Sequence, residues 1–162
     1  MGKSTKLQIR VSPEQKDRIK KQATLAGEDV SKWVLKRLLP PEADQIQNMI
    51  NRLGAGDAAS FVLAEVNDFL MSLSRGTLEV AIHTIDVSML KPFESNYVAA
   101  MIEQACAKKA LQPPGWVYAI APLASPWFAS ELSSLKLHLL TASPPPFRRR
   151  NLFVDSTLGD RV

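Results

Sequence analysis

The chain has 162 residues, of which 46% are hydrophobic and 22% are charged, and its formal net charge at pH 7 is +4. These values are typical of a soluble globular protein with a real core, and the length permits one domain or a small head plus a second domain. The single cysteine, Cys106, excludes an intramolecular disulfide, which fits a reducing cytosol. Neither a signal-peptide-like apolar segment nor a long apolar run is present, so we expect a cytoplasmic protein with no membrane partner.

Residues 6–11 alternate between polar and apolar side chains, which predicts a short strand. A lone strand leaves its backbone N–H and C=O groups unpaired, so we expect it to pair with the same strand of a second copy. Such a two-stranded ribbon fits the DNA major groove, where lysine and arginine suit guanine and glutamine suits adenine. The outward-facing residues that would read bases are Lys6, Gln8 and Arg10.

Two amphipathic helices are predicted to follow this strand. Ser12-Pro13-Glu14-Gln15 has the form of a capping box with proline at the first helical position, and Gly27 is suited to end the helix. Asp29 can cap a second helix whose apolar stripe is too wide for a lone exposed helix, so we expect it to pack against the dimer mate. The N–H groups at the start of that helix, near Ser31 and Lys32, would offer an anion site for a DNA phosphate.

The segment LQIRVSPEQKDRIKKQATLAGEDVSKWVLKRLL resembles the antitoxin-like branch of the ribbon-helix-helix family in the order, spacing and caps of its elements. The resemblance covers about the first quarter of the chain. It implies an intertwined homodimer in which Lys6, Gln8 and Arg10 read operator DNA while Ser31 and Lys32 lie near the backbone. Asp29 departs from the neutral serine common at its position, and its charge disfavours a nearby phosphate.

The charge distribution supports this interpretation over the alternative that the charged face is only a solvated surface. Residues 1–39 hold ten Lys and Arg against four Asp and Glu, whereas residues 40–145 hold six against ten. Residues 146–162 hold four against two. Positive charge is therefore concentrated on the segment with the DNA-reading pattern, as expected for a nucleic-acid footprint.

Apolar periodicity predicts a mainly α chain beyond Pro40-Pro41. We expect helices over residues 42–53, 58–73, 78–84, 95–111 and 131–140, with an irregular aromatic stretch over 116–129. The predicted organisation is a ribbon-helix-helix DNA-binding and dimerisation domain over 1–40, a linker helix and turn over 41–57, and a helical partner-binding domain over 58–162.

No pattern for catalysis, metal binding or a cofactor is evident. Gly2-Lys3-Ser4-Thr5 lacks the earlier glycine and the strand that a phosphate-binding loop needs. His83 and His138 have no nearby ligand set, and Cys106 lies between alanines as a small core residue does. Glu65 and Asp68 share a helix face but have no partner base or nucleophile. We therefore expect neither an enzyme nor a bound cofactor.

The closing segment SPWFASELSSLKLHLLTASPPPFRRRNLFVD resembles the antitoxin partners of AbiE-type nucleotidyltransferase toxins, over about the last fifth of the chain. Residues 144–146 are all proline, which predicts a stiff spacer that presents a toxin-binding tail. The residues of that tail are Phe147, Arg148, Arg149, Arg150 and Asn151. The alternative is that these arginines pair with acidic residues of their own domain.

The sequence thus predicts an antitoxin that neutralises a cognate toxin, a nucleotidyltransferase, and that represses its own operon by binding operator DNA. The main alternative is a stand-alone ribbon-helix-helix transcriptional repressor whose C-terminal domain senses a small ligand. A third possibility is a nucleoid or plasmid-partition DNA binder without a toxin. An adjacent gene with a nucleotidyltransferase signature would favour the first of these.

Overall fold

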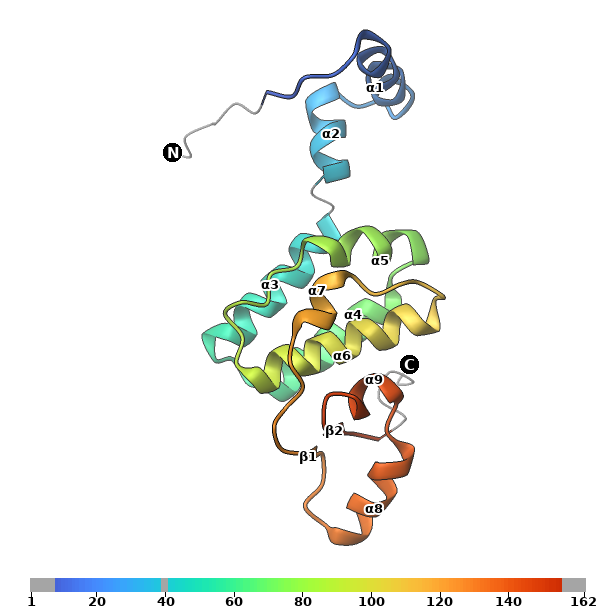
Figure 1. Cartoon of the computed structure of the whole chain (residues 1–162). Helices are drawn as coiled ribbons and strands as arrows, with labels where there is room; N and C mark the ends of the chain where they lie inside the picture. The colour runs from blue at the N-terminus through green and yellow to red at the C-terminus, as the bar shows by residue number, and fades with distance from the viewer. Residues whose placement is uncertain (1–7, 39–40, 156–162) are drawn as a thin grey trace. The chain divides into compact units, whose positions relative to one another are not determined.

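The computed structural model describes residues 8–38 and 41–155, and the chain divides into two compact units, Met1–Pro40 and Pro41–Val162 (Figure 1). We name the described part of the first unit the head and that of the second the body. Both are built mainly from helices, which confirms the predicted mainly α class. The division between the units falls at the two prolines where the second predicted helix was expected to end.

The head consists of α1 (Pro13–Leu25) and α2 (Val30–Leu38). The predicted capping box is present, because the Gln15 N–H donates to Ser12 Oγ at 3.2 Å and the Ser12 N–H donates to Gln15 Oε1 at 2.9 Å. Gly27 adopts a φ of +66°, a left-handed conformation that favours glycine, directly after α1. These local rules therefore placed both ends of α1 correctly.

The predicted strand lies only partly within the described residues, since Lys6 falls outside them. Residues 8–11 precede α1 and are exposed, with Ile9 at 61% and Val11 at 43% of full exposure. These two apolar side chains are not buried by the head itself. The strand and its pairing with a second copy remain predictions.

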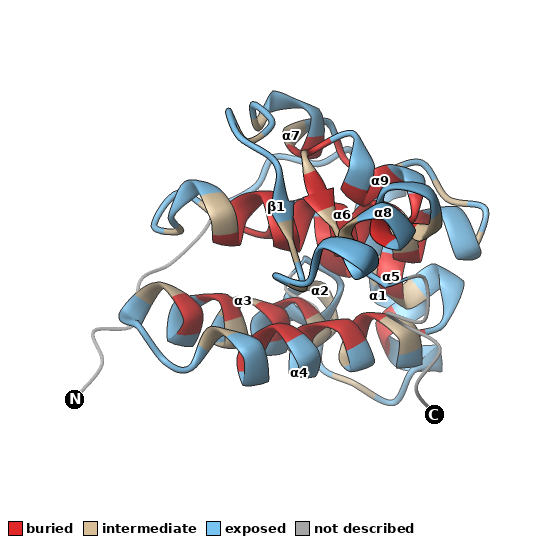
Figure 2. Ribbon diagram, turned by 90° about the horizontal axis from the view of Figure 1, so that it is seen from below, coloured by how far each residue is buried: buried red, intermediate tan, exposed pale blue. Residues whose placement is uncertain are grey.

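The core of the body is formed by α3 (Pro41–Ala55), α4 (Ala59–Ser72) and α6 (Pro92–Lys108). Helix α4 packs against both α3 and α6, and α5 (Arg75–Ala81) packs against α3. Figure 2 shows buried residues along almost the whole of α6. The segment expected to be a linker, 41–57, differs from that expectation, because Ile46, Ile50 and Leu53 of α3 are buried in the core of the body. Its apolar stripe makes α3 an integral part of this unit.

The C-terminal elements of the body form a smaller group around a short parallel sheet. Strand β1 (Trp127–Phe128) pairs with β2 (Leu152–Phe153), with Trp127 opposite Leu152. The Phe128 and Phe153 rings stack with their centroids 4.8 Å apart. Helix α8 (Ser133–Ala142) contacts β2, and α9 (Pro145–Arg148) packs against α6.

Several predicted boundaries were wrong for identifiable reasons. Helix α5 begins at Arg75 rather than 78, since Ser74 Oγ accepts from the Thr77 N–H at 3.2 Å and caps it. The turn η1 (Ile82–Thr84) continues α5, and α7 (Gly115–Ala119) lies at the edge of the stretch expected to be irregular. The predicted prolyl spacer is instead the start of α9, because proline lacks only an N–H that a first helical turn leaves unpaired.

Candidate nucleic-acid interface

The head carries many exposed cations and few ion pairs. The exposed basic residues on its two helices are Lys16, Arg18, Lys20, Lys21, Lys32, Lys36 and Arg37. Among the described residues of the head, the ion pair that forms joins Lys36 Nζ to Glu28 Oε1 at 3.0 Å. Most of these cations therefore face solvent without forming an ion pair among the described residues.

Two of the three predicted base readers lie in the described part of the head. Gln8 and Arg10 are exposed, and Lys6 lies outside the described residues. The Arg10 side chain also lines an open hollow of about 460 Å³ together with Arg18, Gln22 and Trp33. Arg10 thus shares this hollow with one cationic residue of α1, Arg18.

The predicted phosphate site at the start of α2 is partly taken up by the cap. The Ser31 N–H donates to Asp29 Oδ2 at 2.9 Å, so that donor already has an anionic partner. The Lys32 side chain is exposed and retains its freedom to reach a phosphate. An anion at this helix start would have to bind beside the Asp29 carboxylate, which weakens the contact predicted for Ser31 more than that for Lys32.

The head leaves most of its large apolar side chains uncovered. Ala23 is its one buried hydrophobic residue within the described range. In contrast, Leu25 is 81% exposed, and Leu35 and Leu38 are each about half exposed. Burial of a leucine side chain is worth about 1.5–3 kcal/mol, so covering these residues with another surface would stabilise the head.

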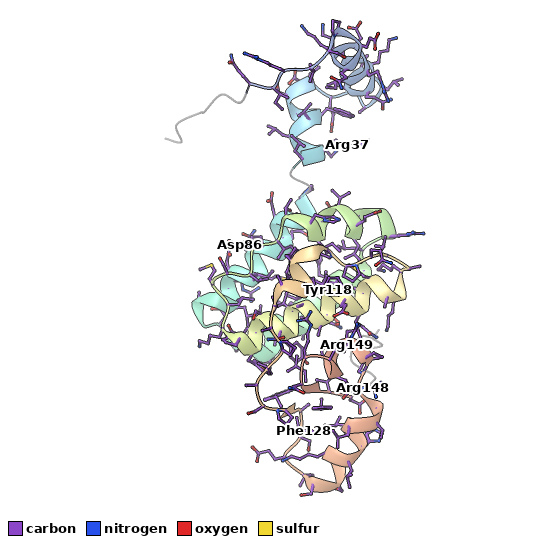
Figure 3. The ribbon with its side chains drawn as sticks, in the orientation of Figure 1. Arg37, Asp86, Tyr118, Phe128, Arg148 and Arg149 are labelled. Atoms are coloured by element: carbon purple, nitrogen blue, oxygen red, sulfur yellow. The ribbon has the colours of Figure 1, made fainter. Side chains whose placement is uncertain are left out.

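A second hollow, missed in the sequence, lies between the two helices of the head. It has a volume of about 270 Å³ and is lined by Arg18, Lys21, Gln22, Trp33 and Arg37. The Arg37 guanidinium lies 5.1 Å from the centre of the Trp33 ring, as in a cation–π contact, and Figure 3 labels Arg37. Their i,i+4 spacing in the sequence was the signal that could have revealed this pair.

The predicted toxin-binding tail is only partly exposed, because Phe147 and Arg150 are buried in the body whereas Arg148 and Arg149 lie at its surface. Phe147 is only 1% exposed, and its ring makes an edge contact with Tyr97 at 5.4 Å. Asn151 has a φ of +58° and donates from Nδ2 to the Leu123 carbonyl at 2.7 Å. Arg148 and Arg149, both labelled in Figure 3, are exposed, and Arg148 has no described ion pair.

Arg149 and Arg150 pair with an acidic residue of their own domain, which was the alternative to toxin binding. Arg149 forms an ion pair with Glu103 of α6, and Arg150 Nη2 lies 3.6 Å from Glu103 Oε2. Arg150 also donates to the Val117 carbonyl at 2.7 Å and to Asn96 Oδ1 at 3.3 Å. Burial lowers the pKa of the Arg150 guanidinium, and the charge of Glu103 opposes this effect. A buried side chain with these partners stabilises the fold rather than presenting charge to another protein.

Helix α8 and the residue before it carry several exposed leucines. Leu132, which precedes the helix, and Leu137 are 64% and 70% exposed, and Leu135 and Leu140 are also exposed. Only Leu139 of this helix is buried. The cation within α8 is Lys136, whose Nζ lies 5.7 Å from the centre of the Phe128 ring. Neither α8 nor α9 contains an acidic residue.

The described residues form no recognisable catalytic or metal-binding site. His83 and His138 are exposed, and no group of three or more His, Cys, Asp or Glu side chains is placed to hold a metal ion there. Burial, with a smaller contribution from the charge of Glu103, raises the pKa of the Cys106 thiol to about 11. A thiol with this pKa is a poor nucleophile at neutral pH.

Comparison of the chain with protein-family models, with curated proteins and with solved structures finds no match. In the described ranges, every helix is too short or too polar to cross a bilayer.

Proposed function

We propose that the protein is a dimeric DNA-binding regulator whose head binds operator DNA through a two-stranded ribbon. One observation supports this proposal most strongly. The head carries cations that form no ion pair, and it also carries apolar side chains that it does not bury. A second copy would bury Ile9, Val11 and the leucines of α2. The cations would remain outside, where phosphates and base edges can reach them.

The dimer follows from the same physical argument as the predicted strand. The segment 8–11 has no strand partner among the described residues, and pairing it with its counterpart would satisfy the backbone groups that are otherwise left to water. Gln8 and Arg10 would then appear twice on one ribbon face, related by a two-fold axis. This arrangement suits a DNA site with matching half-sites.

In the full form of the proposal, the protein is an antitoxin that binds a cognate toxin, a nucleotidyltransferase, and represses its own operon. The resemblance of the closing segment to antitoxins of such toxins supports this part. Because Phe147 and Arg150 are buried, we propose that the toxin binds the exposed leucines of α8 instead. Because α8 carries Lys136 and no acidic residue, an apolar groove with acidic residues at its rim would complement it better than a second copy would.

Footprinting and sedimentation test the DNA-binding part. The protein is expected to protect a site upstream of its own gene and to bind it with two chains per site or a multiple of two. Binding as a single chain, or equal protection along the whole fragment, would contradict the dimeric operator-binding head.

Co-expression with the protein encoded beside it tests the antitoxin part. Leu137→Glu should abolish neutralisation and co-purification, because it places a charge in the centre of the proposed contact. Phe61→Glu is a matched control, since Phe61 is an equally exposed apolar residue on α4. If both variants neutralise the neighbouring protein as wild type does, α8 is not the contact. A DNA affinity that responds to a small molecule instead would favour the stand-alone repressor.

A further inference from the structure

The smaller hollow of the head brings together three cations from two helices. Arg18 and Lys21 come from α1 and Arg37 comes from α2, and Trp33 and the Gln22 amide complete its lining. Arg37 is held over the Trp33 ring at 5.1 Å, which gives its guanidinium a defined position. The hollow therefore presents hydrogen-bond donors and positive charge around one volume of about 270 Å³.

Among the described residues, these three cations form no ion pair, although Glu14 and Asp17 lie one helical turn before Arg18 and Lys21 on α1. The acidic residue of the head that makes an ion pair, Glu28, is engaged by Lys36, which does not line the hollow. Like charges that face one open volume repel each other, and an anion placed between them relieves that repulsion. Arginine and lysine side chains in this arrangement are suited to phosphate oxygens, to which guanidinium groups bind bidentately.

The position of the hollow indicates which anion it serves. It shares Arg18, Gln22 and Trp33 with the larger hollow, and that larger hollow is also lined by Arg10. The two hollows therefore adjoin at Arg18, with Arg10 lining the larger one and Arg37, near the end of α2, lining the smaller one. DNA bound at Arg10 would extend past these cations, because it is a long polyanion. An acidic protein segment has no predicted contact with Arg10 that would bring it to the same place.

We propose that Arg18, Lys21 and Arg37 form a second contact with the DNA backbone, outside the ribbon and the start of α2. This inference rests on the proposed DNA-binding function and names its phosphate contacts. Phosphate contacts set affinity and salt dependence and carry no sequence information directly. We call the cations of the smaller hollow, Arg18, Lys21 and Arg37, the groove cations. They would therefore strengthen binding to any DNA duplex without affecting the choice of operator sequence.

The test compares two double variants that remove equal charge from the full-length protein. Lys21→Gln with Arg37→Gln removes two groove cations that line only the smaller hollow. Lys16→Gln with Lys20→Gln is the control, because both lysines are exposed on α1 and line neither hollow. Binding to a random-sequence duplex and to the upstream fragment is measured over a salt series, and circular dichroism verifies that each variant remains helical.

The groove variant is expected to weaken binding to both duplexes by the same factor. Its plot of log K against log salt should flatten by about 0.9 for each lost phosphate contact, or roughly 2 for each bound head. The control should change the slope less. Equal slopes for the groove variant and the wild type, or equal flattening by the control, would overturn the inference.

The wild-type measurement separates this inference from the function on which it rests. If the wild type binds no duplex, the proposed DNA-binding function fails together with the groove. If the wild type binds and only the groove variant is unchanged, the function stands and the groove contact is rejected. Polyglutamate as a probe distinguishes the other macromolecule class, because loss of polyglutamate binding with unchanged DNA binding would assign the groove to an acidic protein segment.

Discussion

Arg150 Nη2 lies 3.6 Å from Glu103 Oε2, and both side chains are only 6% exposed. Glu103 belongs to α6 in the core of the body, whereas Arg150 follows α9, so this pair joins the C-terminal segment to the core. Arg149 reaches the same carboxylate from the solvent side. Two arginines of the predicted toxin-binding tail therefore pair within the body, Arg150 in its interior and Arg149 at its surface.

Removing the Glu103 charge should destabilise the body strongly. Glu103→Gln leaves Arg150 buried without its counter-charge, and breaking a buried pair in this way costs about 3–5 kcal/mol. Urea unfolding followed by circular dichroism measures the change. Asp68→Asn is the matched control, because Asp68 is exposed on α4 and should alter stability by less than about 0.5 kcal/mol. A Glu103→Gln variant as stable as this control would show that the pair contributes little.

The helix ends of the head were predictable because they depend on neighbouring residues. Ser12 and Gln15 cap one another across three positions, and Gly27 has the left-handed conformation expected after a helix. The Arg150–Glu103 pair depends instead on how distant segments pack. Its signal in the sequence was an acidic residue inside the apolar stretch of α6, but no local rule indicates which arginine it meets.

The misinterpreted prolines illustrate the same limit. Pro144-Pro145-Pro146 favours an extended spacer if it is exposed, and a first helical turn if the next residues have a core to enter. Burial of Phe147 against Tyr97 favours the second outcome. The smaller hollow of the head is lined by residues of both α1 and α2, so it could not be predicted without knowing how these helices pack. Only the four-residue spacing of Trp33 and Arg37 is evident in the sequence.

The capping box should make a measurable contribution to the head. Ser12→Ala removes the hydroxyl that accepts from the Gln15 N–H and should cost about 1 kcal/mol. Ser12→Asp should retain most of the stability, since aspartate is also a good N-cap residue. Thermal unfolding at several protein concentrations separates this effect from dimerisation. Equal losses for alanine and aspartate would mean that the hydroxyl acts in some other way.

Dimerisation of the head should depend on the apolar face of the predicted ribbon. Ile9→Asp would bury a charge there at a cost of several kcal/mol, and analytical ultracentrifugation should then find a monomer or an unfolded head. Gln8→Asp places the same charge on the opposite, outward face and should leave the dimer intact. A helical Ile9→Asp protein that remains dimeric would rule out the ribbon.

The body should lose stability at alkaline pH. Burial raises the pKa of Tyr97 to about 12, and burial together with the charge of Glu103 raises the pKa of Cys106 to about 11. The unfolded chain releases these protons at lower pH than the folded chain, because the unfolded pKa is 10.0 for Tyr97 and 9.0 for Cys106. The contribution of these groups to stability is therefore complete below those values. It then declines as the pH rises through the folded values.

Urea unfolding between pH 8 and the upper folded pKa checks this dependence. Cys106→Ala and Tyr97→Phe should each flatten the decline in the free energy of unfolding, whatever their effect at pH 8. Variants with the same alkaline slope as the wild type would show that other groups cause the loss.

The central claim is that the head reads operator DNA as a dimer, and a salt series on two single variants tests it most directly. Arg10→Ala should cost about 1–3 kcal/mol on the fragment upstream of the gene and little on a random duplex, so that sequence preference relaxes. Lys32→Ala should weaken both duplexes alike and flatten the salt dependence, because it removes a phosphate contact. A wild-type protein that binds the upstream fragment no more tightly than the random duplex, or an Arg10→Ala variant with unchanged preference, would contradict the proposed head.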